Sequence, residues 1–315
     1  MLSRILRIGA GFELLAAIAL AAALVHYGTS PWLAVTTAVM LPLAVQGVPL
    51  AIEFAIGALV DRRPVARLGP LALARVWWGE TWRSFKVFNV DQPWRAGFPE
   101  PAVVHDPSRP AALFIHGYMC NRATWRPWLV DRGLAQRWNC ATVNLEPVFG
   151  AVDRYTDIVH AAVERLRAAS GAERVTLVCH SMGGLVARAY LRANGHGAVA
   201  RVITIDTPHH GTLFARFGHG DNTRQMRVAC DYVRGLAESD EPVEFVCFAS
   251  QHDNLVVPRD GQILACAEAV WFERIGHLAM SDSDEVLKKL IEVVERPRPE
   301  AAKAATAAPV TATGS

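Results

Sequence analysis

A run of 39 residues without Asp, Glu, Lys or Arg, from Leu14 to Ile52, constrains the fold of this 315-residue chain more than any other feature. A bilayer core about 30 Å thick is crossed by roughly 20 helical residues. Residues 27–31 read as a turn, and the segments on either side, residues 8–27 and 32–52, each have the length of one span. We therefore predict a hairpin of two transmembrane helices within residues 1–63.

Two other structures are compatible with part of this run. Arg4 and Arg7 before an Ala/Leu-rich core are typical of a signal peptide, and a buried helical hairpin of a soluble protein is also apolar. The sequence before the turn has no clear A-x-A cleavage site, and a second apolar segment follows it. Uncharged runs of this length rarely occur in soluble cores. Two spans are therefore the favoured interpretation.

Positive charges flank the hairpin at both ends and are missing from its turn. Arg4 and Arg7 lie at the first span, and Arg62, Arg63 and Arg67 follow the second. Because segments rich in Lys and Arg stay on the cytoplasmic side, both ends should be cytoplasmic. We predict a multi-pass protein of the inner (cytoplasmic) membrane whose remaining residues lie in the cytoplasm.

The remaining composition excludes several classes of protein. Lys and Arg number 32 against 30 Asp and Glu, a net charge of +2, so nothing indicates a nucleic-acid partner. None of the six cysteines forms a C-x-x-C pair, which argues against zinc ribbons and thioredoxin chemistry. Residues 71–88 mix three Trp with three cationic side chains, which fits either a membrane–water interface or a helix that caps the core of the next domain.

Short apolar runs alternate with helical patterns in the second part of the chain, which predicts a parallel sheet with helices on both faces. The resulting α/β domain covers residues 101–295, behind an interfacial or linking segment at 64–100. Residues 296–315 are rich in Pro, Ala and Thr and should be a disordered tail. The predicted strands are 112–115, 140–145, 175–179, 201–206, 244–248 and 269–273, and the predicted helices are 153–169, 182–194 and 281–294.

Ser181 lies between the third predicted strand and a helix, in the segment Cys179-His180-Ser181-Met182-Gly183-Gly184. Small residues around a Ser at such a junction allow a sharp turn that projects its hydroxyl above the sheet, as in the G-x-S-x-G nucleophile elbow. Cys179 replaces the first glycine of that pattern. The alternative is that Ser181 merely caps the helix.

A serine nucleophile needs a base and an acid that orients the base. Asp253 follows the fifth predicted strand and His277 follows the sixth, in the chain order Ser, Asp, His that accompanies this elbow. His252 and Asp206 are the rival candidates.

An oxyanion formed at the acyl carbon would need two N–H donors. The backbone N–H of Met182, directly after the serine, is one. The first predicted strand ends in His116-Gly117-Tyr118, where glycine permits close approach, so the N–H of Tyr118 is the other.

Together with Thr207-Pro208-His209-His210-Gly211-Thr212, these motifs resemble the α/β-hydrolase superfamily over residues 112–294. The resemblance is greatest to bacterial triacylglycerol lipases and related esterases, with some likeness to inositol-deacylase-type lipases. It implies an α/β-hydrolase fold, here preceded by two transmembrane helices, and a lid, for which residues 213–241 are a short and polar candidate. Some lipases of this group bind calcium, but no matching ligands are identified, and the paired histidines are better explained by the motif than by a metal.

The resemblance and the motifs together imply a membrane-anchored serine hydrolase that cleaves carboxylic esters of lipid-like substrates. Ser181 would attack the acyl carbon, His277 would move the proton, and Asp253 would orient His277. No cofactor is implied. An acyltransferase or thioesterase could use the same triad, and a non-catalytic membrane scaffold is the alternative from another class.

Overall fold

The computed structural model describes residues 1–61, 68–236 and 243–297. Two long helices come first, α1 (Leu2–His26) and α2 (Pro31–Val60). Both are long and apolar enough to cross a membrane, as predicted. No residue of the most apolar stretch of α1 is buried against the rest of the protein. The hydroxyl of Ser30 accepts a hydrogen bond from the N–H of Leu33 at 3.4 Å and so caps α2.

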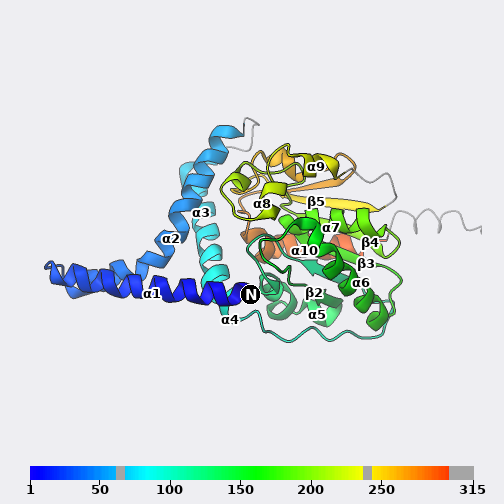
Figure 1. Ribbon diagram of the computed structural model, residues 1–315, viewed down its shortest axis with the longest axis horizontal. Helices are drawn as coiled ribbons and strands as arrows, with labels where there is room; N and C mark the ends of the chain where they lie inside the picture. The colour runs from blue at the N-terminus through cyan, green and yellow to red at the C-terminus, as the bar shows by residue number, and fades with distance from the viewer. Residues whose placement is uncertain (62–67, 237–242, 298–315) are drawn as a thin grey trace, which may run out of the picture.

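The start of the hairpin is attached to the rest of the molecule. At the start of α1, Ser3 Oγ donates to the carbonyl of Gln92 at 2.9 Å and Arg7 Nε donates to the carbonyl of Pro93 at 2.7 Å. Figure 1 shows α1 running outward from this point and α2 returning and bending along the rest of the molecule. Two prolines lie inside α2, at 42 and 49, and proline bends a helix because it removes a backbone hydrogen bond.

Helix α3 (Pro70–Phe85) lies beside α2. Its inner face is buried and includes Glu80 and Ser84, while its outer face exposes Leu71, Trp78 and Trp82. The buried inner face fits the alternative of a helix that caps the core of the next domain, and the interfacial alternative for the outer face stays a prediction. A π-helix, η1 (Lys86–Asp91), and a short helix, α4 (Gln92–Trp94), lead from α3 toward the sheet.

All six predicted strands are present and form one parallel sheet in the order β2-β1-β3-β4-β5-β6. The boundaries differ by a few residues from those predicted; β2, for example, ends at Thr142 and not at residue 145. The strands are β1 (Ala111–Ile115), β2 (Asn139–Thr142), β3 (Val175–His180), β4 (Val199–Ile205), β5 (Glu244–Ser250) and β6 (Glu268–Phe272).

Helices pack on both faces of the sheet. One core contains α6 (Thr156–Ser170) and α7 (Met182–Asn194), and the other contains α10 (Asp284–Glu295) with Trp125 and Trp128. The last helix begins at Asp284 and not at residue 281 as predicted. Residues 279–282 form a 3-10 turn, η7 (Ala279–Asp282), and the hydroxyl of Ser283 caps α10.

Short helical segments make the remaining connections. They are η2 (Arg122–Trp125), η3 (Pro127–Asp131), α5 (Leu134–Arg137), η4 (Val152–Tyr155), η5 (Leu213–Arg216), α8 (Asp221–Gln225), α9 (Asp231–Gly235) and η6 (Arg259–Gln262). Of the predicted lid, residues 213–236 form η5, α8 and α9, and residues 237–241 lie outside the described residues. Arg62, Arg63 and Arg67 and the tail from residue 298 also lie outside them. All six cysteines are free thiols.

Candidate active site

Ser181 occupies a strained turn between β3 and α7. Its φ of 53° and ψ of −126° lie in a region that residues with a Cβ rarely adopt. Three hydrogen bonds hold this backbone: its N–H donates to the carbonyl of Ile205 at 2.8 Å, and its carbonyl accepts from Thr207 Oγ1 at 2.9 Å and from the N–H of Gly184 at 3.0 Å. A serine that only caps a helix would need none of this strain, and its side chain makes no cap hydrogen bond.

Glycines allow the segments around Ser181 to approach one another closely. A Cβ on Gly183 would lie 2.5 Å from the carbonyl oxygen of Ile115, and a Cβ on Gly184 would overlap Thr207 Oγ1. Cys179, which stands where the elbow pattern has its first glycine, is fully buried in the core. Cys179 thus packs as an ordinary strand residue, and the fold accommodates it at the position where the pattern has a glycine.

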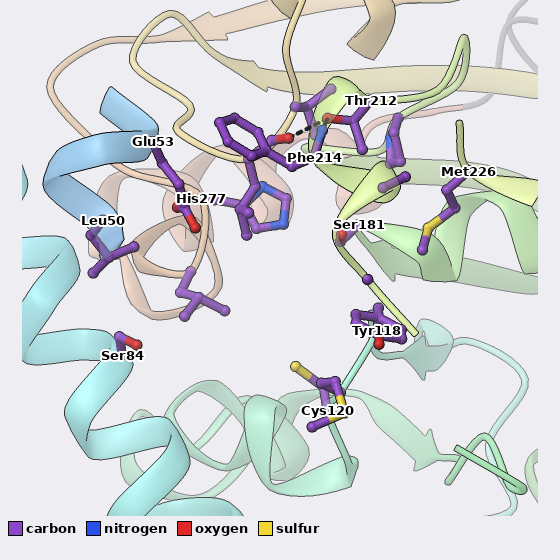
Figure 2. Close-up of a pocket in the computed structure, with 18 of the residues that line it drawn as sticks. Leu50, Glu53, Ser84, Tyr118, Cys120, Ser181, Thr212, Phe214, Met226 and His277 are labelled. Carbon is purple, nitrogen blue, oxygen red and sulfur yellow. Dashed lines mark hydrogen bonds between the residues drawn. The ribbon is translucent and has the colours of Figure 1, made fainter. Parts of the chain in front are cut away.

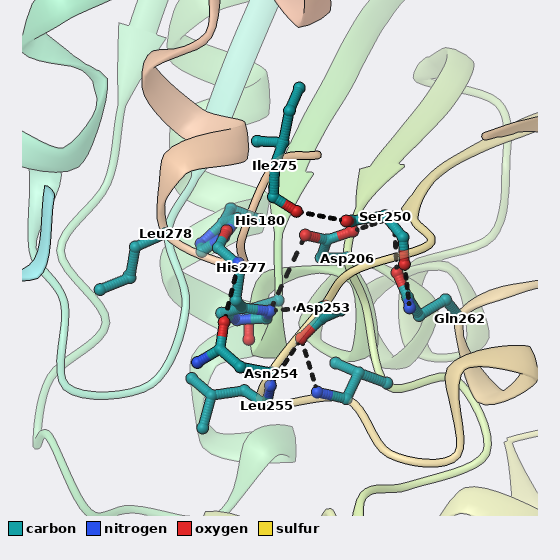
Figure 3. Close-up of polar contacts among 12 residues, drawn as sticks. His180, Asp206, Ser250, Asp253, Asn254, Leu255, Gln262, Ile275, His277 and Leu278 are labelled. Carbon is teal, nitrogen blue, oxygen red and sulfur yellow. Dashed lines mark hydrogen bonds and ion pairs between the residues drawn. The ribbon is translucent and has the colours of Figure 1, made fainter. Parts of the chain in front are cut away.

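His277 and Asp253 are brought together from loops after two different strands, as Figure 3 shows. His277 Nδ1 lies 2.9 Å from Asp253 Oδ2, and both side chains are buried. The second oxygen, Asp253 Oδ1, accepts from the N–H groups of Leu255 at 2.6 Å and Val256 at 2.8 Å. Burial alone would raise the pKa of Asp253, but attraction to His277 and these hydrogen bonds outweigh it, so that the pKa is lowered and the carboxylate stays ionised.

The two rival residues have other partners. Asp206 Oδ2 lies 3.9 Å from His277 Nδ1, and its Oδ1 accepts from the N–H of Ser250 at 2.8 Å. Burial and the neighbouring Asp253 raise the pKa of Asp206, the opposite of the shift at Asp253. His252 Nδ1 accepts from the N–H of Arg274 at 3.0 Å. The geometry therefore pairs His277 with Asp253.

His277 retains enough basicity to exchange a proton near neutral pH. Burial would lower the pKa of His277, but Asp253, Glu80 and Glu53 together raise it above the ordinary value. Its carbonyl accepts from His180 Nε2 at 3.1 Å, and the two rings lie 4.9 Å apart. Burial lowers the pKa of His180 to about 3, so His180 stays neutral beside it.

The loop that carries Tyr118 is positioned by a buried histidine. His116 Nδ1 lies 2.9 Å from the carbonyl of Gly117, and its Nε2 accepts from the N–H of Leu145 at 3.0 Å. Burial lowers the pKa of His116 to about 4, which keeps it neutral in this role. The N–H of Met182 is the first of α7, where the helix dipole favours negative charge. Within the described part of the chain, neither that N–H nor that of Tyr118 has a recorded hydrogen-bond acceptor.

A largely apolar cavity of about 360 Å³ contains Ser181 and His277 on its wall (Figure 2). The segment after β1 and the predicted lid line part of it, through residues such as Tyr118, Phe214 and Met226. The N-terminal helices line the opposite part, with Leu50 and Glu53 of α2 among them.

Four polar residues of this region were not predicted from the sequence: His180, Asn254, Glu53 and Glu80. His180 was within the elbow motif and Asn254 adjoined Asp253, so nearness in sequence could have indicated them. Glu53 and Glu80 are isolated acidic residues in apolar or aromatic helices and carry no local signal.

The only group of potential metal ligands found among the described residues is the one already discussed, Asp206, Asp253 and His277, whose ligand atoms lie within 4.8 Å of one another. The hydrogen bond between His277 and Asp253 at 2.9 Å and the 3.9 Å approach of Asp206 to His277 account for this closeness. His209 Nε2 contacts Thr204 Oγ1 at 3.1 Å, and His210 Nε2 contacts the carbonyl of Ile263 at 3.1 Å. The histidine pair therefore has structural partners.

The chain is similar to known proteins in part of its sequence and in its fold. The model of the PGAP1-like alpha/beta domain matches residues 148–265. The fold is similar to that of a Bacillus licheniformis lipase in its mature form, with a TM-score of 0.52 and 17% identity over 63% of this chain and 96% of that one. The chain therefore has an α/β-hydrolase fold. Lipase B of Aspergillus fumigatus is similar to this chain as well, with a TM-score of 0.54 and 16% identity over 67% of this chain and 58% of that one.

Two curated relatives are triacylglycerol lipases, from Pseudarthrobacter phenanthrenivorans and Burkholderia plantarii. The chain is 49% identical to each over 57 residues, which is 18% of its own length. The matched part spans only 18% and 16% of the two lipases. The comparisons thus support the fold and the predicted resemblance to lipases.

Proposed function

We propose that this protein is a membrane-anchored serine hydrolase that cleaves carboxylic esters. The observation that carries the proposal is the strained Ser181 on the wall of the same cavity as His277, which is paired with the ionised Asp253 at 2.9 Å. Similarity to triacylglycerol lipases over 57 residues supports the same reaction class. The catalytic unit corresponds to residues 101–295, preceded by the hairpin of residues 1–63 and the segment 64–100.

Each proposed residue has one role in the reaction. Ser181 Oγ bonds to the acyl carbon while its proton passes to His277 Nε2, the ring nitrogen that Asp253 leaves available. The N–H groups of Tyr118 and Met182 stabilise the oxyanion. Collapse of the tetrahedral intermediate breaks the carbon–oxygen bond, and His277 protonates the departing alkoxide. Water, deprotonated by His277, then attacks the acyl-enzyme and releases the carboxylic acid and the free Ser181.

The cavity favours a substrate with an apolar acyl chain. Leu50, Phe214 and Met226 surround the space next to Ser181, and such walls bind hydrocarbon through burial of apolar area. Because α2 supplies one of these walls and is also long enough to cross a bilayer, an ester drawn from the membrane is the substrate class that the geometry fits best. No cofactor enters this reaction.

The hairpin of α1 and α2 supports membrane anchoring. Large apolar side chains such as Ile8, Phe12 and Trp32 are exposed, at 62%, 68% and 85%. An exposed apolar surface of this extent is typical of a segment that is covered by lipid. The outer face of α3, with its exposed Trp78 and Trp82, fits the membrane–water interface.

Fluorophosphonate labelling of the detergent-solubilised full chain tests the proposal, together with hydrolysis of p-nitrophenyl esters from short to long acyl chains. We expect wild type to be labelled and active, and Ser181→Ala to be unlabelled and to lose activity by many orders of magnitude. Hydrolysis within about tenfold of wild type in Ser181→Ala would contradict the assignment of the nucleophile. A non-catalytic scaffold would not be labelled, whereas an acyltransferase would be labelled but would prefer an acceptor other than water.

A further inference from the structure

The loop that carries His277 is bound on one side by a buried carboxylate from an N-terminal helix. Glu80, on α3, is fully buried, and its Oε1 accepts from the N–H of Leu278 at 2.6 Å while its Oε2 accepts from the N–H of Ala279 at 3.0 Å. A Cβ on Gly276 would overlap Glu80 Oε2, so only glycine lets the loop come this near. Both oxygens of Glu80 are thus used to hold the two residues that directly follow His277.

A second carboxylate holds the same loop from the other side. Glu53 Oε2, on α2, accepts from Asn254 Nδ2 at 2.7 Å. The other end of that amide, Asn254 Oδ1, accepts from the N–H of His277 at 3.2 Å. Figure 2 shows Glu53 beside His277 on the cavity wall. The amide of Asn254 therefore connects α2 to the backbone of His277 itself.

Charge and hydrogen bonding act together at this point. The titratable groups that face His277 are Asp253 and Asp206 from loops of the sheet, His180 at the end of β3, Glu53 from α2 and Glu80 from α3. Glu53 and Glu80 both favour the protonated imidazole, because an anion near a cation lowers its free energy in a poorly solvated site. The imidazolium forms only after the serine has lost its proton.

We propose that Glu80 and Glu53 are positioning residues for His277, so that α2 and α3 complete the active site of this α/β-hydrolase. This inference rests on the proposed function. It assigns the N-terminal helices a role in catalysis beyond anchoring: they hold the histidine loop at both ends and set the basicity of its ring. The sheet region alone would retain Ser181 and Asp253 but would not hold His277 in register with them.

The isosteric variants Glu80→Gln and Glu53→Gln test this in the solubilised full chain. In Glu80→Gln the new amide N–H₂ faces a backbone N–H, so one loop contact is lost. We expect kcat to fall roughly 10- to 100-fold with little change in KM, as for a misplaced catalytic group. The amide oxygen introduced by Glu53→Gln can still accept from Asn254, so this variant should keep its kcat at alkaline pH. In both variants the acid limb of kcat/KM should move to lower pH, because a carboxyl group that favours the protonated imidazole when it is ionised is gone.

Asp91→Asn is the matched control. Asp91 is another buried carboxylate of the N-terminal region, bound to Arg83 at 3.3 Å and to Arg95 at 3.2 Å. It has no contact with His277, so its loss should lower the melting temperature and leave the acid limb in place. If Glu80→Gln fails to fold, Glu53→Gln still tests the movement of the acid limb, since it keeps its hydrogen bond.

The outcomes separate the two proposals. An inactive and unlabelled wild type would overturn the proposed function. The positioning role alone would be overturned by a different result. In that case wild type is active, kcat of Glu80→Gln is within about twofold of the wild-type value, and the acid limb of kcat/KM is unmoved in both variants. The positioning role would also be overturned if the acid limb of kcat/KM moved in Asp91→Asn, because the effect would then come from general loosening of the helices.

Discussion

Gly117 and Ser181 lie so close that a Cβ atom added to Gly117 would stand 2.8 Å from the Cβ of Ser181. The same atom would lie 3.2 Å from the carbonyl oxygen of His180. Real Cβ contacts below about 3 Å essentially do not occur, so one of the two loops would have to move. The spacing between the proposed nucleophile and the proposed oxyanion donor on Tyr118 therefore depends on the missing side chain at position 117.

Gly117→Ala should lower kcat by roughly 10²- to 10³-fold, a loss comparable to removal of one oxyanion donor. The measurement is steady-state hydrolysis of a p-nitrophenyl ester by the solubilised full chain. Gly97→Ala is the control, because nothing lies within 4 Å of a Cβ at that position. Equal activity of the two variants would show that the 117–118 loop does not need its present distance from Ser181.

Asp253→Asn should lower kcat by up to about 10⁴, because an amide stabilises the wrong tautomer of His277. Asp206→Asn should cost far less, since Asp206 lies 3.9 Å from the ring and its Oδ1 contact with Ser250 can be kept by the amide oxygen. Each variant replaces one carboxylate oxygen by an amide nitrogen in the same buried surroundings. The kcat of each variant is therefore the control for the other. The reverse ranking would transfer the role of the acid to the loop after β4.

The rate should fall on the acid side with an apparent pKa above 6.5, the ordinary value for histidine. Asp253 and the two N-terminal carboxylates raise the pKa of His277 above this value. Only the neutral imidazole accepts the serine proton, so activity is lost as the pH falls through the raised pKa and is retained above it. The measurement is the dependence of kcat/KM on pH between about pH 5 and 9, with hydrolysis followed through the carboxylic acid that is released. An acid limb at or below 6.5 would contradict the electrostatics described for the site.

The parts of the site that lie at strand ends could be predicted from the sequence. Ser181, Asp253 and His277 each follow an apolar run, and parallel strands bring such ends to one edge of the sheet. The strands themselves were predicted for the same reason, since each is a short apolar run of β-formers. Local pattern was sufficient here because the parallel sheet brings these strand ends together, although the three residues are far apart in sequence.

The contacts of the N-terminal helices could not be predicted in this way. Glu80 meets Leu278 across 198 positions of the chain, and Glu53 meets Asn254 across 201. In sequence both acids look like polar interruptions of apolar helices, because nothing local indicates that they face another part of the protein. The start of the last helix was predicted at residue 281, three residues too early, because the sequence does not show that residues 279–282 form a separate turn before the Ser283 cap.

Leu50→Trp should reduce hydrolysis of long-chain esters relative to short-chain ones by about tenfold or more, because the larger side chain fills apolar space next to Ser181. Val48→Trp is the matched control on the same helix, since Val48 is 59% exposed and Leu50 is 7% exposed. The ratio of kcat/KM for p-nitrophenyl palmitate to that for the butyrate is the quantity to compare. An unchanged ratio in Leu50→Trp would remove α2 from the acyl-binding wall.

The start of α1 should lie on the same side of the membrane as the proposed catalytic unit. Ser3 and Arg7 bind the carbonyls of Gln92 and Pro93, and a hairpin returns the chain to the side from which it started. The arginines at both ends of the hairpin, with none in its turn, predict that this side is the cytoplasm.

A phosphatase fused after Val294 should therefore be inactive, and a fluorescent protein fused there should be fluorescent, since the phosphatase needs an oxidising compartment to form its disulfides. Adding several Lys to the turn at residues 28–31 while removing Arg62, Arg63 and Arg67 should disturb the orientation, which makes this altered chain the internal control. If the unaltered chain gives an active phosphatase fusion, or if protease added outside spheroplasts digests the catalytic unit, the orientation is wrong. The first apolar helix would then act as an export signal, and its contacts with residues 92 and 93 would form outside the cytoplasm.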